Sequence, residues 1–325
     1  MASNENKKEK LIEMKNLKKY FPMKKRQVLK AVENVTMDIY KGEILSLVGE
    51  SGSGKSTIGK AIIGLEKIKS GKIIYEGREI DRKFRNRRSE YNRNVQMIFQ
   101  DSLSSLNPKK RVIDLISEPL RNFENLTPDE EKRKVSELLE IVGMNREDIF
   151  KYPHEFSGGQ RQRLGIARAV ATKPKLIIAD EPVSALDLSV QAQVLNYMKD
   201  IQEQFGLSYL FISHDLGVVK HMCDYMFIMY RGRFVETGTK NDIYKNPEHF
   251  YTKRLIAAIP EIHPEKRTEN KRRRLEIERE YLANEKKYYD ENGRVFDLKK
   301  LTDTHFVAFK DKNLRNNGNS EKGGK

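Results

Sequence analysis

Two short stretches of the chain carry side chains suited to phosphate chemistry. The first, at residues 49–56, reads GESGSGKS and matches the pattern G-x-x-x-x-G-K-[ST]. Its glycines let the backbone curl so that successive N–H groups face phosphate oxygens, and the following helix adds its dipole. We expect Lys55 to reach the β- and γ-phosphates of a nucleotide and the Ser56 hydroxyl to ligate magnesium.

The second stretch, at residues 176–181, is an apolar segment that ends in Asp180 and Glu181. At the carboxyl end of a strand, Asp180 can hold magnesium through water, and Glu181 can orient or deprotonate an attacking water. A helix cap would be the structural alternative for such an acid, and Asp187 suits that role better. Together the two stretches predict a nucleotide-hydrolysing site.

A third pattern is FSGGQ at residues 156–160, directly before a long helical segment. The N-terminus of such a helix is a second place where backbone N–H groups can bind phosphate. The pattern resembles the signature of ATP-binding-cassette (ABC) ATPases, which reads LSGGQ in most members, with Phe156 in place of leucine. In that family the signature binds the ATP held by the phosphate loop of a partner subunit. The resemblance therefore implies a dimer, with each nucleotide between two chains.

This resemblance covers about residues 11–260 and implies roles for further residues. Gln100 would touch magnesium and link the site to membrane subunits, His214 would contact the γ-phosphate, and residues 184–187 (SALD) would signal across the dimer. Phe21 is the candidate for stacking on adenine, with Tyr20 as the second choice. The implied cofactors are ATP and Mg²⁺. The implied site residues are, for catalysis, Glu181, His214 and Gln100; for ATP binding, Phe21, Tyr20, Gly49, Ser51, Gly52, Ser53, Gly54, Lys55, Ser56 and Thr57; for the signature, Ser157, Gly158, Gly159 and Gln160; for the signalling loop, Ser184 and Asp187; and for Mg²⁺, Ser56, Gln100 and Asp180.

Three stretches are similar to the oligopeptide and dipeptide permease ATPases in particular. They are LKKYFP at 17–22, SLNPK at 105–109 with EPL at 118–120, and FYTKRL at 250–255 with AAIP at 257–260. The first stretch favours the second, F-type ATPase of such a pair. The resemblance implies an ATPase that powers oligopeptide uptake. Importers of dipeptides, nickel, opines and glycosides share much of this sequence and stay open as alternatives.

The same resemblance implies the partners and the location of the chain. The partners would be a second ABC ATPase in a heterodimer, two transmembrane permease subunits and an extracellular peptide-binding protein. The chain would lie on the cytoplasmic side of the cell membrane as a peripheral protein. It has no apolar run near the roughly 20 residues of a membrane span, and its first residues do not read as a secretory signal.

The elements that must position these residues alternate along the chain. The pattern predicts strands at 44–48, 95–99, 176–179 and 208–212 and helices at about 56–65, 111–121, 128–142, 158–171 and 189–204. Such alternation indicates an α/β fold with a parallel sheet. With the resemblance, this implies a P-loop NTPase (RecA-like) core with an N-terminal antiparallel β subdomain and an inserted helical signature subdomain at about 101–165. We expect a flexible N-terminus at 1–10, the ATPase domain at 11–260 and a charged, partly disordered extension at 261–325.

Composition limits the remaining possibilities. Of 325 residues, 38% are hydrophobic and 34% charged, and the net charge of +15 admits nucleic acid or anionic lipid as a partner. The single cysteine, Cys223, excludes an internal disulfide and a cysteine-ligated iron–sulfur cluster. A non-transport ABC ATPase acting on ribosomes or DNA is the rival interpretation. Against it, the chain carries one cassette and no large insertion, so we expect no nucleic acid partner.

Overall fold

The computed structural model describes residues 9–24, 27–80, 88–101, 105–259 and 267–310. Most of the N-terminal segment expected to be flexible, and the end of the C-terminal extension expected to be disordered, lie outside the described residues. Among the described residues, no helix combines the length and the apolar character needed to cross a membrane.

The described strands form two sheets, and their bounds are β1 Lys10–Pro22, β2 Val28–Tyr40, β3 Ile44–Val48, β4 Ser70–Tyr75, β5 Arg78–Glu79, β6 Val95–Ile98, β7 Leu176–Asp180, β8 Ser208–Ser213, β9 Tyr225–Tyr230, β10 Arg233–Thr239, β11 Leu298–Lys300 and β12 Phe306–Ala308. The α-helices are α1 Lys55–Ile62, α3 Arg88–Asn94, α5 Val112–Arg121, α6 Pro128–Ile141, α7 Gly158–Val170, α8 Leu188–Phe205, α9 Leu216–Val219, α10 Lys240–Lys245, α11 Phe250–Ala257 and α12 Arg267–Asn284.

The larger sheet has the order β11-β12-β10-β9-β3-β8-β7-β6. β6, β7, β8, β3 and β9 are parallel, and β10, β12 and β11 continue the sheet in antiparallel pairs. The parallel strands β3 and β7 read ILSLV and LIIAD and are almost wholly buried. Continuous apolar runs of this kind are typical of parallel strands with both faces covered. The expected α/β fold is therefore confirmed.

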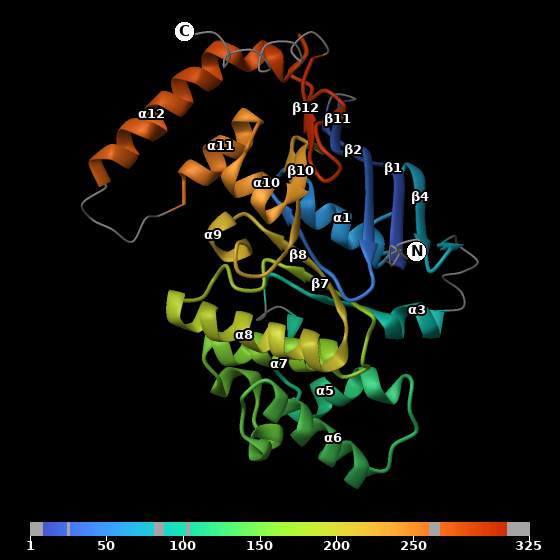
Figure 1. Cartoon of the computed structure of the whole chain (residues 1–325). Coiled ribbons are helices and arrows are strands. Elements are labelled where there is room, and N and C mark those ends of the chain that lie inside the picture. Colours follow the sequence, from blue (N-terminus) through green and yellow to red (C-terminus); the bar gives the residue numbers. More distant parts are fainter. Residues whose placement is uncertain (1–8, 25–26, 81–87, 102–104, 260–266, 311–325) are drawn as a thin grey trace, which may run out of the picture.

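Helices and a second sheet cover the two faces of the larger sheet. Ile177 and Ala179 of β7 belong to the hydrophobic core beneath α7 and α8. Leu176 and Ile178 point the other way, into a core shared with α1 and the smaller sheet. Figure 1 shows α1 between β8 of the larger sheet and the strands β1, β2 and β4. This alternation follows from the two-residue repeat of a strand.

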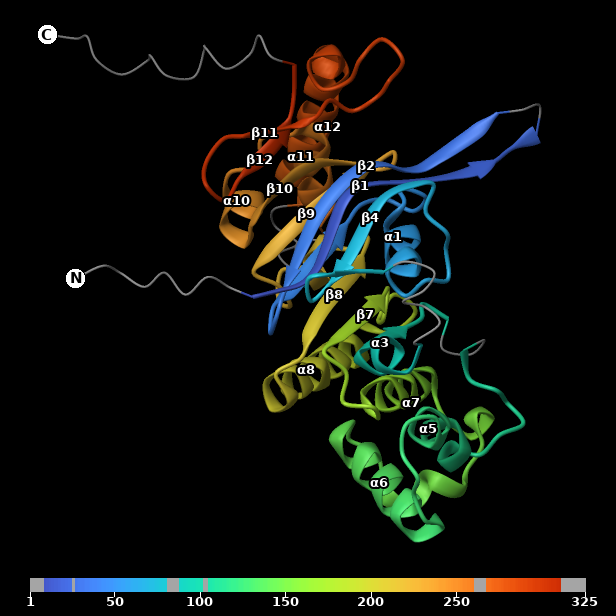
Figure 2. The same ribbon diagram turned by 90° about the vertical axis from the view of Figure 1, so that its right-hand side faces the viewer.

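The smaller sheet has the order β2-β1-β4-β5 and is antiparallel throughout. Figure 2 shows that β1 and β2 run side by side and extend beyond the rest of the molecule. This sheet is the N-terminal antiparallel subdomain that the sequence predicted.

A helical region that contains α5, α6 and α7 lies at the opposite end of the molecule from β11 and β12 (Figure 1). Two of its helices begin with capping boxes, in which Thr127 and Ser157 accept hydrogen bonds from the backbone N–H three residues later. Such caps satisfy N–H groups that a helix start would leave without partners. α5, α6 and α7 agree with the predicted ranges to within about one residue, whereas α1 ends about three residues earlier than predicted.

The described residues after position 260 add one α-helix and two strands to the fold. β12 pairs with β10 and β11 pairs with β12, so residues 298–308 extend the larger sheet. α12 packs against α11, where Arg254 forms an ion pair with Glu278 at 2.9 Å. Described residues on both sides of position 260 thus pack together. The sequence did not predict these contacts, since short strands like β11 leave no clear pattern in sequence.

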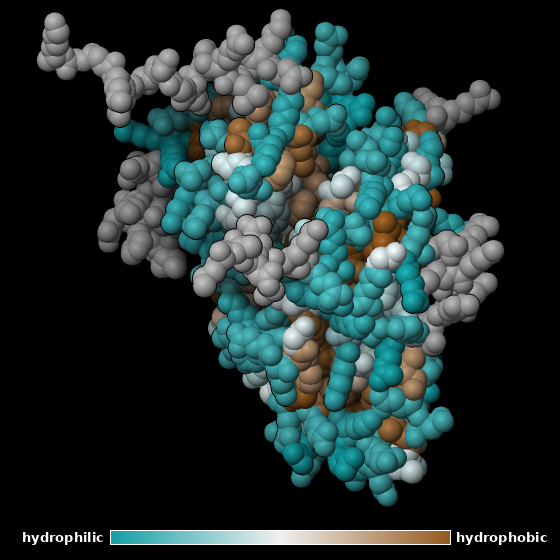
Figure 3. All heavy atoms as spheres, turned by 45° about the vertical axis from the view of Figure 1, so that its right-hand side comes forward, coloured by the Kyte–Doolittle hydropathy of each residue, from teal (hydrophilic) through white to brown (hydrophobic). Residues whose placement is uncertain are grey.

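The face of the molecule drawn in Figure 3 is mostly hydrophilic. Figure 3 shows hydrophobic residues only in small separate patches on the face in view. Among the described residues, the most exposed large hydrophobic side chain is Leu188 at the start of α8, at 84%.

Candidate active site

The order of the parallel strands brings four loops together at one edge of the larger sheet. In the order β3-β8-β7-β6, the phosphate loop follows β3, His214 follows β8, Asp180 ends β7 and Gln100 follows β6. All four strands are parallel, so their carboxyl ends meet on the same side. This is the edge where open α/β sheets bind ligands.

The phosphate loop needs glycine at two positions for steric reasons. Gly54, at the N-cap of α1, has φ of 110°, and a Cβ there would lie 2.1 Å from the carbonyl oxygen of Ala31. A Cβ on Gly49 would lie 2.1 Å from the carbonyl oxygen of Met229. Both distances are far below any real contact, so the loop keeps this shape only with glycine.

Lys55 lies across the loop that precedes it. Its Nζ atom donates hydrogen bonds to the carbonyl oxygens of Gly49 at 2.6 Å and Glu50 at 2.9 Å. Burial lowers the pKa of Lys55. The ammonium group is therefore held at the start of α1, beside the backbone N–H groups that a phosphate would contact.

The three predicted magnesium ligands converge. The Ser56 hydroxyl donates to Oδ1 of Asp180 at 2.8 Å, and both residues line a cavity of about 480 Å³ together with Gln100. Burial raises the pKa of Asp180. Hydroxyl, carboxylate and amide oxygens are the donors that Mg²⁺ prefers, so this set fits the ion.

Glu181 is buried and held on both sides. Gln100 donates from Nε2 to Oε2 of Glu181 at 2.9 Å, and Nδ1 of His214 lies 3.1 Å from Oε1. The backbone of Glu181 has φ of 47°, and its N–H donates to the carbonyl oxygen of Ile212 at 2.9 Å. A non-glycine residue in this left-handed region costs about 1–3 kcal/mol, and such strain is concentrated at functional sites.

The signature segment begins α7 in an exposed position. Ser157 is the N-cap, and its hydroxyl accepts from the N–H of Gln160 at 3.3 Å. Ser157 and Gly158 are exposed, whereas Gly159 is buried, and a Cβ on it would lie 2.4 Å from Cγ1 of Val190 on α8. The polar start of α7 is thus open to a second molecule while its glycine packs inward.

The loop between β7 and α8 is tied to Glu181. The hydroxyl of Ser184 donates to the carbonyl oxygen of Glu181 at 3.1 Å. Gln191 braces the same loop through the carbonyl oxygens of Val183 at 3.1 Å and Leu186 at 2.9 Å. Asp187 is the N-cap residue of α8, which is the helix-capping position that the sequence suggested for it. Its side chain makes no capping hydrogen bond.

The two aromatic candidates for adenine stacking have contacts of their own. Tyr20 donates from its hydroxyl to Glu33 at 2.6 Å, and the ammonium group of Lys69 lies 4.4 Å from its ring centroid. The ring of Phe21 has the ammonium group of Lys19 at 4.5 Å. These contacts involve residues outside the phosphate loop, so the choice between the two rings stays a prediction.

The sequence did not single out Tyr251 for the site. Its hydroxyl accepts a hydrogen bond from the backbone N–H of Glu50, in the phosphate loop, at 2.8 Å. Tyr251 belongs to the FYTKRL stretch, which carried the family resemblance and no role in the site. No local pattern links residues 201 positions apart.

Comparison with known proteins identifies the family. The chain matches the ABC transporter family over residues 32–184 and the oligopeptide/dipeptide transporter C-terminal region over residues 235–291. It is 52% identical over 304 residues to the oligopeptide transport ATP-binding protein OppF of Lactococcus lactis subsp. lactis, which covers 92% of this chain and 95% of the relative. The OppF protein of Bacillus subtilis is 47% identical over 302 residues, covering 92% of this chain and 96% of the relative.

Solved structures agree with this assignment. A dimer of the ATP-binding cassette MJ0796 in a post-hydrolysis state, bound to ADP and Pi, is 25% identical, with a TM-score of 0.64, and covers 71% of this chain and 99% of that one. The family match over residues 32–184 contains the phosphate loop, the signature and the acidic end of β7. The chain therefore belongs to the ABC transporter family, among the oligopeptide transport ATP-binding proteins, and is an ATPase.

Proposed function

We propose that this chain is the ATP-hydrolysing subunit of an importer that takes up oligopeptides. The observation that supports the chemistry best is the buried carboxylate of Glu181, held between Gln100 and His214 at the edge where the phosphate loop begins. The relatives named for oligopeptide transport, at up to 52% identity, support the cargo.

In this proposal the groups at the site share the tasks of water activation, charge stabilisation and metal binding. Glu181 accepts a proton from the attacking water, or orients that water, and Gln100 and His214 hold its two oxygens in place. Lys55 and the N–H groups at the start of α1 stabilise negative charge on the phosphates. Ser56, Asp180 and Gln100 would hold Mg²⁺, which would neutralise negative charge on the phosphates when bound.

The exposed signature supports a pairing of this chain with a second ATPase. Ser157 and the backbone N–H groups at the start of α7 would contact the ATP held by the partner's phosphate loop. Ser184, which contacts the backbone of Glu181, would report closure of the pair to the water-activating carboxylate. We propose a second, non-identical ABC ATPase as the partner.

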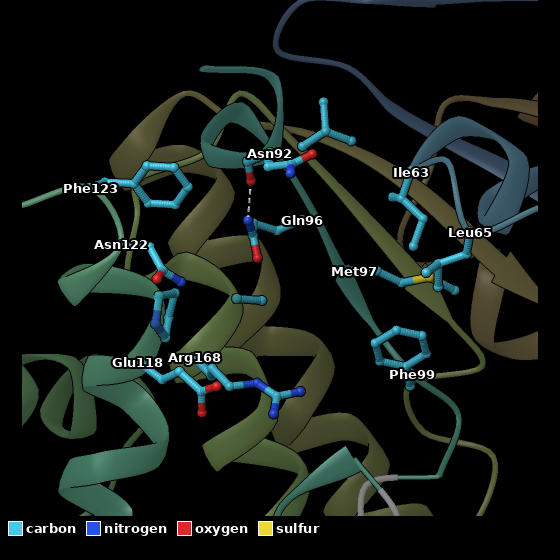
Figure 4. A pocket seen from close by; sticks show the side chains of 13 residues that line it. Ile63, Leu65, Asn92, Gln96, Met97, Phe99, Glu118, Asn122, Phe123 and Arg168 are labelled. Atoms are coloured by element: carbon cyan, nitrogen blue, oxygen red, sulfur yellow. Dashed lines mark hydrogen bonds between the residues drawn. The ribbon is translucent and has the colours of Figure 1, made fainter. Parts of the chain in front are cut away.

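A second cavity suits contact with the permease subunits. It measures about 660 Å³ and lies between the end of α1, the strand β6 and the helix α5 (Figure 4). Leu65 and Phe99 supply apolar walls, and Glu118 and Arg168 supply charge. Phe99 and Arg168 also line the cavity around Gln100, so a helix seated here would press on the magnesium site.

The complete importer would contain two transmembrane permease subunits and an extracellular peptide-binding protein, with this chain on the cytoplasmic face of the membrane. The test is a gentle purification of the tagged chain from solubilised membranes, with the associated proteins identified by mass spectrometry. We expect two multispanning subunits, a second ATPase and a peptide-binding protein. Recovery of ribosomal or DNA-repair proteins with no membrane subunit would overturn the transport proposal.

Dipeptides are the second candidate cargo. The dipeptide transport ATP-binding protein DppF of Lactococcus lactis subsp. cremoris is 45% identical over 301 residues. Uptake assays with di-, tri- and longer peptides in a strain lacking this chain distinguish the two. Selective loss of dipeptide uptake would favour the second candidate.

A further inference from the structure

Tyr251 of α11 supports the phosphate loop from behind. Its side chain is fully buried, and its hydroxyl accepts from the N–H of Glu50 at 2.8 Å. The carbonyl oxygen of the same Glu50 accepts from the N–H of Ser53 at 3.1 Å and from Nζ of Lys55 at 2.9 Å. The peptide groups on both sides of Glu50 are therefore fixed, and with them the curvature of the loop.

The position of Tyr251 depends in turn on a series of hydrogen bonds between buried polar groups. The N–H of Tyr251 donates to Nδ1 of His249 at 3.1 Å, and the N–H groups of Glu248 and His249 donate to the carboxylate of Glu236 at 2.8 and 3.2 Å. Oε1 of Glu236 lies 2.8 Å from Nε2 of His305, which directly precedes β12. Glu236 and His249 are fully buried. Burial lowers the pKa of His249 to about 3, so its ring stays neutral and can accept the hydrogen bond.

Aromatic packing connects the same two regions. The ring centroids of Tyr230 and Tyr251 are 4.5 Å apart, and those of Tyr230 and Tyr289 are 5.5 Å apart. Tyr289 is buried and belongs to the segment between α12 and β11. Residues after position 260 thus reach the phosphate loop by a polar route and an apolar route, both through Tyr251.

We infer that Tyr251 is a positioning residue for the phosphate loop, and that the hairpin of β11 and β12 acts through His305 and Glu236 to keep it in place. The C-terminal segment thereby sets the affinity of the site for ATP. The physical reason is that a loop which binds phosphate through its backbone N–H groups loses affinity when those groups depart from a common centre. This inference rests on the proposed function, in which the loop holds the phosphates of ATP.

The first experiment compares Tyr251→Phe with Tyr244→Phe in the full chain. Both changes remove one hydroxyl that is hydrogen-bonded to backbone, because Tyr244 donates to the carbonyl oxygen of Leu216, away from the phosphate loop. We expect Tyr251→Phe to raise the Kd for ATP about tenfold, which corresponds to about 1.4 kcal/mol. At saturating ATP the turnover of the assembled importer should change by less than about twofold. Tyr244→Phe should leave the Kd unchanged.

A second pair of variants tests the hairpin without changing α11. His305→Ala removes the contact with Glu236, whereas His305→Gln keeps a donor that can reach the carboxylate. We expect His305→Ala to raise the Kd for ATP and His305→Gln to restore it toward the wild-type value. A purely structural role would lower the melting temperature and leave the Kd of the folded fraction unchanged, which would overturn the inference.

The outcomes separate the inference from the proposed function. If the wild-type chain binds no ATP, the proposed function fails. If the wild-type chain binds ATP and Tyr251→Phe binds it equally well, only the positioning role of Tyr251 fails.

Discussion

Nδ1 of His214 lies 3.1 Å from Oε1 of Glu181, although the two residues follow different strands. β7 and β8 are parallel neighbours, so the residues after them emerge side by side. Gln100, after β6, reaches the other carboxylate oxygen at 2.9 Å. The order of the strands thus surrounds one buried acid with two polar side chains.

Replacing Glu181 with glutamine should abolish most ATP turnover and preserve ATP binding. The amide keeps the shape of the side chain but cannot accept a proton, and losing a general base costs about 10²–10⁴-fold. Phosphate release and nucleotide binding by the purified assembly measure the two effects. Glu203→Gln, on the exposed face of α8, is the matched control. Near-normal turnover in Glu181→Gln would remove Glu181 from the base role.

Ser157→Ala should lower the turnover of the paired ATPases and leave ATP binding by the single chain unchanged. The reason is that Ser157 would act on the nucleotide of the partner. Thr127→Ala is the control, because both residues cap a helix through a capping box and each loss costs about 1 kcal/mol of stability. Equal effects of the two variants on turnover would show that Ser157 matters only as a cap.

The ion pair of His305 and Glu236 should make stability depend on pH in a defined direction. The hydrogen bond to Glu236 raises the pKa of His305 above its ordinary value of 6.5, with Asp242 and Glu248 adding to the shift. A raised pKa means that the stabilisation is complete below the unfolded-state value and is lost as pH rises through the folded-state value.

The unfolding free energies of the wild-type chain and of His305→Gln, measured by denaturant titration between about pH 5.5 and about pH 9, test this. Their difference should be largest at the acid end and shrink as pH rises. A difference that stays constant over this range would contradict the charged pair.

Cys223 should resist thiol reagents in the folded chain. It is buried, and burial raises the pKa of its thiol to about 12, so almost no thiolate exists at neutral pH. Since the chain has one cysteine, labelling should change from none in the native protein to complete in denaturant. Stoichiometric labelling under native conditions would show that this region opens readily.

The sequence was most informative where a role is encoded in neighbouring residues. Gly49 and Gly54 are required because a Cβ at either position would lie 2.1 Å from a backbone carbonyl oxygen. The capping boxes at Thr127 and Ser157 start their helices where expected. The apolar runs at 44–48 and 176–179 predicted the buried strands β3 and β7. Each of these signals depends on local backbone geometry, which a short pattern specifies.

Only the tertiary structure decided which distant residues meet. The contact of Tyr251 with Glu50, and the pairing of β12 with β10, join segments that share no local pattern. The three-residue strands β11 and β12 are too short to show a two-residue repeat, and their place follows from the free edge of β10. Sequence therefore determined the chemistry and the main elements of this ATPase, whereas long-range strand pairing and packing decided what holds its phosphate loop in place.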